Sequence, residues 1–155
     1  MQSVERRKFL KMAAAGSALA AAAAALPLAG ILEWSGANRL KFRAAVGMPR
    51  NPLPAYASFV VEGNLDLAGG TGTVRKSLYA GAPNAMSNIL FPGTQRVIRV
   101  TSVQRSGDAI RIAGAIDESQ ALGPRESRNV VITIDRRAGL ARADFLGREM
   151  LLQVQ

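Results

Sequence analysis

Three acidic residues that lie close together in the sequence, Asp117, Glu118 and Glu126, are the best candidates for chemistry in this chain. Paired carboxylates can act as general acid and general base, and their hard oxygens can bind calcium weakly. Their spacing does not match an EF-hand loop. Because Arg125 and Arg128 lie near enough in the sequence to neutralise them, we expect a solvated polar loop and no catalytic residue.

The residue types that the chain lacks exclude more chemistry than this loop offers. The 155 residues include no cysteine and no histidine. Their absence excludes thiolate nucleophiles, Ser-His-Asp and Cys-His triads, ordinary zinc or copper sites, iron–sulfur ligation and histidine-ligated haem. The sequence GGTG at 69–72 is not followed by a helix that would hold a phosphate, so we expect a hairpin turn there. We expect no metal and no cofactor.

The chain is basic, with 20 lysine and arginine residues against 11 acidic residues and a net charge of +9. Arginines on predicted strands form a basic face for an anionic surface or lipid headgroups, or they pair with carboxylates on neighbouring strands. These arginines are Arg96, Arg99, Arg105, Arg111 and Arg142. Few aromatic side chains are placed to stack on bases, so no nucleic-acid partner is expected.

The N-terminus carries a pattern of its own. Residues 1–11 are positively charged, and residues 12–32 contain no charge and consist mainly of alanine. As a helix, 21 residues would extend roughly 30 Å, about the thickness of a hydrocarbon core. The basic part includes five residues at fixed spacing: Arg6, Arg7, Phe9, Leu10 and Lys11.

These five residues resemble the twin-arginine translocation signal, Ser/Thr-Arg-Arg-x-Phe-Leu-Lys, with Glu5 where a small hydroxyl residue is commonest. The resemblance covers only the first 30 or so residues. It implies export of a folded protein by the twin-arginine translocase across a bacterial cytoplasmic membrane, to the periplasm or outside the cell. Small residues offer cleavage sites at 23–25 or at Ala29. Without cleavage, residues 12–32 remain as a membrane anchor.

Behind this segment the apolar residues alternate with polar ones, which indicates half-buried strands. We assign residues 1–32 to the signal or anchor, 33–56 to a strand and a proline-rich connector, and 57–155 to the core of one domain. Seven or eight short strands with glycine turns predict an all-β antiparallel sandwich or small closed barrel, preceded by the N-terminal hydrophobic helix. The inward-facing series include Leu40, Phe42 and Ala44; Phe59, Val61 and Leu65; Ile110, Ile112 and Ile116; Val130, Ile132 and Ile134; and Met150, Leu152 and Val154.

The segment 81–94 is the longest irregular stretch and is unusually apolar, with Met86, Ile89, Leu90 and Phe91. A single helical turn is expected at 86–90. Long loops on small scaffolds often carry function. This loop either plugs one end of the fold or forms a binding lip, and we take it as the possible contact loop.

Together these features favour a non-enzymatic accessory or binding module that acts in the cell envelope on an unknown ligand. An envelope protein or an anionic surface is the expected partner. The alternative is a small cofactor-independent hydrolase or isomerase that uses Asp117, Glu118 or Glu126 in a barrel mouth. A third possibility is a subunit of a larger envelope complex.

Overall fold

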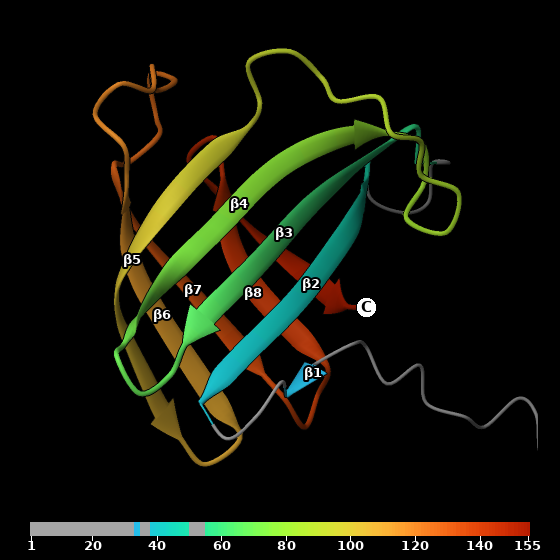
Figure 1. The fold of residues 1–155 in the computed structure, drawn as a ribbon. Coiled ribbons are helices and arrows are strands. Elements are labelled where there is room, and N and C mark those ends of the chain that lie inside the picture. The colour runs from blue at the N-terminus through green and yellow to red at the C-terminus, as the bar shows by residue number, and fades with distance from the viewer. Residues whose placement is uncertain (1–32, 35–37, 50–54) are drawn as a thin grey trace, which may run out of the picture.

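The fold is a closed eight-stranded antiparallel β-barrel, shown in Figure 1. The computed structural model describes residues 33–34, 38–49 and 55–155, and this part of the chain contains no helix. The predicted signal, anchor helix and most of the proline-rich connector lie outside the described residues. The strands are β1 (Glu33–Trp34), β2 (Arg39–Met48), β3 (Ala57–Asp66), β4 (Thr71–Ala80), β5 (Arg96–Ser106), β6 (Ala109–Ile116), β7 (Asn129–Asp135), β8 (Leu140–Phe145) and β9 (Arg148–Val154).

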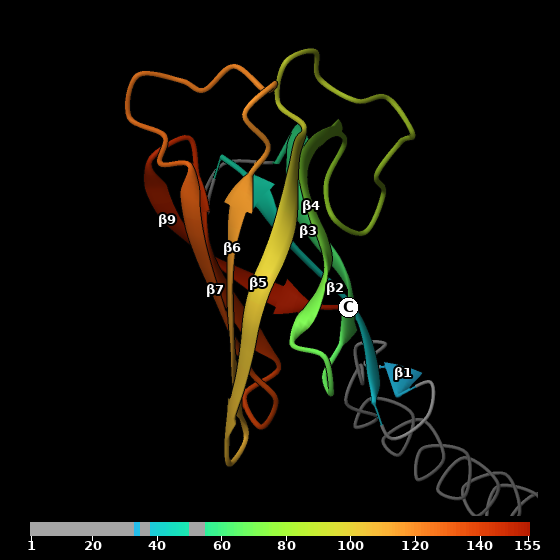
Figure 2. The same cartoon turned by 60° about the vertical axis from the view of Figure 1, so that its left-hand side comes forward.

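Each strand pairs with the next one along the chain, and β2 also pairs with β9. The closing pairs are Ala44 with Val154 and Ala45 with Gln153. The short strand β1 adds to the beginning of β2, outside the ring. The second view in Figure 2 shows the strands wrapping around a common axis. The prediction of an all-β fold is confirmed, and a barrel is the arrangement adopted.

The barrel interior is filled with apolar side chains. The five inward-facing series named above are buried, from Leu40 on β2 to Val154 on β9. Inside, the rings of Phe59 and Phe145 lie 4.6 Å apart between centroids. A barrel of eight strands has an interior just wide enough to be filled by side chains or to hold one small ligand. In this barrel, side chains fill the interior.

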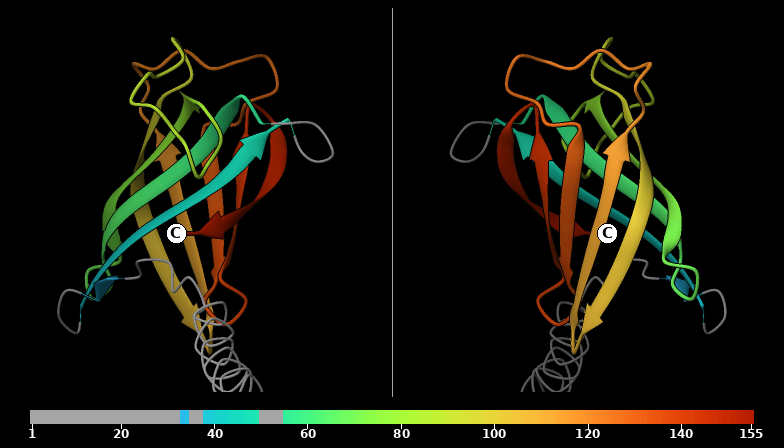
Figure 3. Two further views of the ribbon diagram at one scale, coloured as in Figure 1. Left: turned by 90° about the vertical axis from the view of Figure 1, so that its right-hand side faces the viewer. Right: turned by 90° about the vertical axis from the view of Figure 1, so that its left-hand side faces the viewer.

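The two ends of the barrel differ in the length of their connections, as both views in Figure 3 show. At one end β2 begins, and short turns at 67–70, 107–108 and 136–139 join successive strands. At the opposite end, which we call the mouth, lie the long loops 81–95 and 117–128. Glycine is required in the short turns, because Gly70, Gly107 and Gly139 all have φ near +60°.

Candidate functional site

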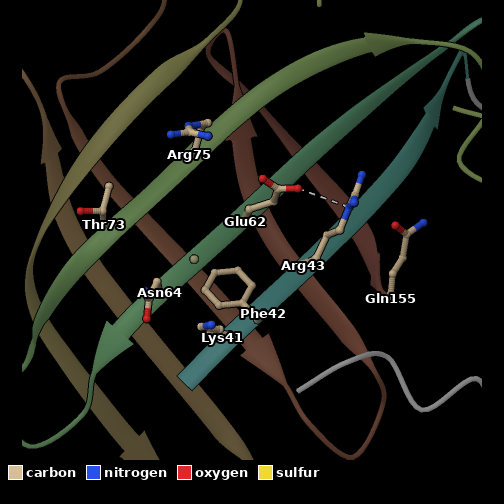
Figure 4. A pocket seen from close by; sticks show the side chains of 9 residues that line it. Lys41, Phe42, Arg43, Glu62, Asn64, Thr73, Arg75 and Gln155 are labelled. Carbon is tan, nitrogen blue, oxygen red and sulfur yellow. Dashed lines mark ion pairs between the residues drawn. The ribbon is translucent and has the colours of Figure 1, made fainter. Parts of the chain in front are cut away.

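The outer face of β2, β3 and β4 carries a hollow of about 540 Å³, drawn in Figure 4. We call this hollow the outer groove. It is lined by side chains that point away from the barrel axis, together with the backbone of Gly63 and the edge of Phe42. The lining residues are Lys41, Phe42, Arg43, Glu62, Gly63, Asn64, Thr73, Arg75 and Gln155. Its volume is within the usual range for small-ligand sites.

Strand register places the polar residues of the outer groove in two rows. Arg43, Glu62 and Arg75 are direct neighbours across β2, β3 and β4. Two residues further along the strands, Lys41, Asn64 and Thr73 form the second row. Both rows point outward because successive side chains on a strand alternate between faces. The sequence pattern that buries Phe42 and Val61 therefore builds the groove on the other side.

The floor of the groove depends on a glycine. Gly63 lies opposite Phe42 on the inner face, and a Cβ added at Gly63 would overlap the Phe42 ring. The ring thus occupies the space that a side chain at position 63 would fill. Phe42 itself is 3% exposed, so its ring gives the groove an apolar base without presenting an open aromatic face.

The charges in the outer groove are only partly compensated. Arg43 Nε lies 3.4 Å from Glu62 Oε1, and both side chains remain more than one-third exposed at 45% and 37%. No ion pair joins Lys41 or Arg75 to a carboxylate of the described residues. Two cations in the hollow are therefore available for an acidic group from outside.

A second hollow of about 550 Å³ continues the outer groove toward the mouth. It shares Arg43, Glu62 and Gln155 with the first, and its other wall is formed by Tyr79 and the turn at 83–88. Arg43 Nη2 reaches Met86 Sδ at 4.0 Å, which links the turn to β2. The two hollows form one continuous surface that runs along the outside of β2–β4.

The predicted contact loop at 81–94 is extended, and the expected helical turn at 86–90 is wrong. Tyr79 forms an isolated β-bridge with Leu90, and Phe91 N–H donates to the Leu78 carbonyl at 2.9 Å. The chain at 87–91 therefore continues the ladder along β4, and backbone pairing replaces helical hydrogen bonds. Ile89 is 69% exposed, while Met86, Leu90 and Phe91 are partly buried.

A second charged cluster lies inside the mouth, where Arg96 meets Glu126. Arg96 Nε lies 3.0 and 3.1 Å from the two carboxylate oxygens of Glu126, and Nη2 lies 2.9 Å from Oε2. Arg96 Nη1 also donates to the carbonyls of Gly93 and Gln95. The two side chains are 9% and 1% exposed. This buried pair fastens the loop 117–128 to the beginning of β5.

Lys76 points into the barrel directly beside Arg96, its neighbour across β4 and β5. The ammonium donates to the Asp144 carbonyl at 2.9 Å and lies 3.8 Å from Asp144 Oδ1. The residue is only 2% exposed. Burial lowers the pKa of Lys76 and outweighs the opposing effect of the Asp144 and Glu126 charges.

Two of the three acidic candidates lie in solvent, and the third is held by an arginine. Asp117 and Glu118 are exposed. Hydrogen bonds from the Ser119 hydroxyl and N–H lower the pKa of Asp117, and Arg99 lies 3.7 Å away. Glu126 is buried separately from both. The structure therefore does not assemble the three carboxylates into one site.

The neutralising partner predicted for Glu126 is wrong. Arg125 and Arg128 were expected to neutralise the loop, but Glu126 pairs with Arg96. Arg128 instead donates to the Asp117 carbonyl at 2.8 Å. Arg96 accordingly does not belong to the outer basic face, whereas Arg99, Arg111 and Arg142 are exposed there. Arg96 faces inward because it lies on the same face of β5 as the buried residues Ile98 and Val100.

Lys76 and the two rows that form the outer groove were not predicted from the sequence. A signal for Lys76 was present, because it lies between Val74 and Leu78 on the inward-facing positions of β4. The groove had no such signal. Its residues come from three strands, and their proximity depends on a register that alternation alone does not set.

Known proteins offer no guide to the activity of these sites. No protein-family model matches the chain, and neither a curated protein nor a solved structure matches it. Among the described residues, no cluster of three acidic side chains is placed to hold a metal ion, and no helix is long and apolar enough to cross a membrane. The residues that resemble a twin-arginine signal, Arg6 to Lys11, lie outside the described part.

Proposed function

We propose that this protein is an exported, non-catalytic binding module of the cell envelope, and that it holds its ligand in the outer groove. The observation that carries this proposal is the contrast between a filled barrel and a hollow outer face. The groove offers about 540 Å³ and two cations, Lys41 and Arg75, that form no ion pair with a carboxylate in the described part of the chain. Binding sites commonly combine such a volume with a few convergent polar groups.

The carboxylates support binding rather than catalysis. A general acid or base near neutral pH needs a pKa shifted toward the working pH. Burial raises the pKa of Glu126, but the Arg96 hydrogen bonds, the Gly123 N–H and the charges of Arg96 and Lys76 outweigh burial and lower it overall. Such a carboxylate stays ionised and bound to its arginine. Asp117 is held in its ionised form by Ser119.

The direction of the barrel is consistent with attachment to a membrane at the end with the short turns. The chain enters β2 at the end with the short turns, where Leu67 N–H donates to the Asn38 carbonyl. An uncleaved anchor at 12–32 would join this end directly, because Glu33 follows the anchor and pairs with Lys41 near the beginning of β2. The mouth and the loops 81–95 and 117–128 would then face away from the bilayer.

Export is tested by expressing the full chain in a bacterium with a twin-arginine translocase. We expect the protein in the extracytoplasmic or membrane fraction, protease-accessible from outside the cytoplasm. Replacing Arg6 and Arg7 together by lysine should retain it in the cytoplasm, while Lys8→Arg should not change its location. A cytoplasmic wild-type chain would refute the export part of the proposal.

Binding is tested separately with a fluorophore on a single cysteine, which is unique because the chain has none. The label is placed at Thr73→Cys in the groove, and at Arg111→Cys on β6 as the control. A low-molecular-mass extract of the envelope should change the fluorescence of the first and leave the second unchanged. Equal responses, or no response at Thr73, would refute ligand binding in the groove.

A further inference from the structure

The arrangement of free cations and neutral polar groups in the outer groove identifies a class of ligand. Lys41 and Arg75 lie diagonally across Gly63, two strands apart and two residues apart along the strands. With about 4.8 Å between strands and about 3.4 Å per residue, their Cα atoms are roughly 12 Å apart. Each cation can therefore contact a different acidic group of one extended ligand.

The positions between the two cations are occupied by hydrogen-bonding side chains. Asn64 and Thr73 are exposed beside Gly63, and Gln155 lies at the β2 side of the groove. The continuation toward the mouth adds Asn84, Ser87 and Asn88. Amides and hydroxyls both donate and accept hydrogen bonds, which is what a ligand with many hydroxyl groups requires.

The groove lies on the flat of the sheet. A closed barrel has no free strand edge there, so an extended peptide could not pair its backbone with β2–β4. The surface instead offers side chains only, and those of Lys41, Asn64 and Arg75 lie on the outside of β2–β4. Planar guanidinium groups bind carboxylates in a bidentate manner.

From these features we infer that the outer groove binds an acidic oligosaccharide, a linear chain of sugar units that carries carboxylates. The inference rests on the proposed binding function and specifies its ligand. Arg75 and Lys41 contact carboxylates on different sugar units. Asn64, Thr73 and Gln155 bind the hydroxyl groups between them. The Arg43–Glu62 pair lies beside Arg75 and limits how many acidic groups the groove accepts.

The test uses the full chain, purified in detergent, and calorimetric titration with a hexamer of galacturonic acid. The matched control ligand is the methyl ester of the same hexamer, which has the same hydroxyls without the charges. We expect the acid to bind and the ester to bind at least tenfold more weakly. Arg75→Gln and Lys41→Gln should each weaken binding of the acid about tenfold, the effect of losing one charge-assisted hydrogen bond.

Arg111→Gln is the matched control variant. It removes the same charge from an exposed position on β6, and it should change the affinity less than twofold. Equal weakening by Arg111→Gln and Arg75→Gln would overturn the inference, because binding would then follow net charge. Equal binding of acid and ester would overturn it as well.

Two further outcomes separate this inference from the proposed function. If hexaglutamate binds with the same dependence on Arg75 and the sugar acid does not, the groove is a binding site but its ligand is an acidic peptide, and the inference fails alone. If no probe binds while the envelope extract still changes the Thr73→Cys signal, the ligand class is again wrong and the binding function stands. If the extract also has no effect, both fail.

Discussion

Two arginine–glutamate pairs in this barrel have the same chemistry and opposite surroundings. At the mouth, Arg96 and Glu126 approach to 2.9 Å with side chains 9% and 1% exposed. In the outer groove, Arg43 and Glu62 lie 3.4 Å apart with side chains 45% and 37% exposed. The first pair is bidentate and surrounded by protein, whereas the second is single-contact and open to water. The buried pair therefore holds the structure together, whereas the exposed pair can exchange its partners.

The surroundings of the mouth pair also shift the pKa of its carboxyl group. The pKa of Glu126 is lowered, because hydrogen bonds from Arg96 and Gly123 outweigh the effect of burial. A carboxyl group with a lowered folded pKa stabilises the protein above the ordinary value of 4.5, and this stabilisation is lost as the pH falls through the folded value. The contribution of the mouth pair to stability should therefore be lost in acid, as the pH falls through the lowered pKa of Glu126.

The largest expected effect is at the mouth. Glu126→Gln leaves Arg96 buried without a carboxylate, which typically lowers the free energy of unfolding by about 3–5 kcal/mol. Urea unfolding monitored by circular dichroism measures the loss, and the acid sensitivity described above should disappear with it. The matched control is Glu118→Gln in the same loop, where the side chain is exposed and the change should stay within about 0.5 kcal/mol. Equal stability of the two variants would show that the mouth pair has no structural role.

The groove should be more sensitive to its apolar base than to its charges. Gly63→Ala forces the Phe42 ring to move, and such overpacking costs about 1–3 kcal/mol. Thermal or urea unfolding should detect this loss. Gly123→Ala is the control, because an added Cβ there meets only Glu126 Oε2 at 3.8 Å. Replacing the ring by a smaller side chain, with Phe42→Leu in the Gly63→Ala background, should recover part of the stability. If stability is not recovered, the clash with the Phe42 ring is not the cause of the loss.

Sequence patterns predicted the barrel wall well and the sites poorly. Alternation identified the inward residues of β2, β6, β7 and β9, because period-2 burial is a local property of each strand. The orientation of Lys76 and Arg96 was missed, since charged residues were assumed to face water. Their burial becomes acceptable only through Asp144 and Glu126, which lie 68 and 30 residues away. Partners that distant are fixed by closure of the barrel, which no local pattern encodes.

Lys76 provides a test of intermediate size at the mouth. Burial lowers its pKa below the ordinary 10.5, so the unfolded chain binds more protons than the folded one between the two values. The free energy of unfolding should therefore rise with pH across this alkaline range. Lys76→Met keeps the volume and removes the charge, so it should raise stability at pH 7 by roughly 1 kcal/mol and flatten the alkaline rise. A variant that unfolds more easily at every pH would indicate that the Asp144 contact outweighs burial.

The smallest effect is expected for the exposed pair, and it completes the comparison. Arg43→Gln should change the free energy of unfolding by no more than about 0.5 kcal/mol, because exposed ion pairs gain little in water and are screened by salt. A double-mutant cycle with Glu62→Gln, measured by urea unfolding at low and high salt, isolates the pair from the individual substitutions. A coupling near zero at high salt leaves Arg43 and Glu62 free to take other partners, as the groove requires. A coupling free energy as large as that between Arg96 and Glu126, and unchanged by salt, would contradict this expectation. The Arg43–Glu62 pair would then have a structural role and would not be free to bind a ligand.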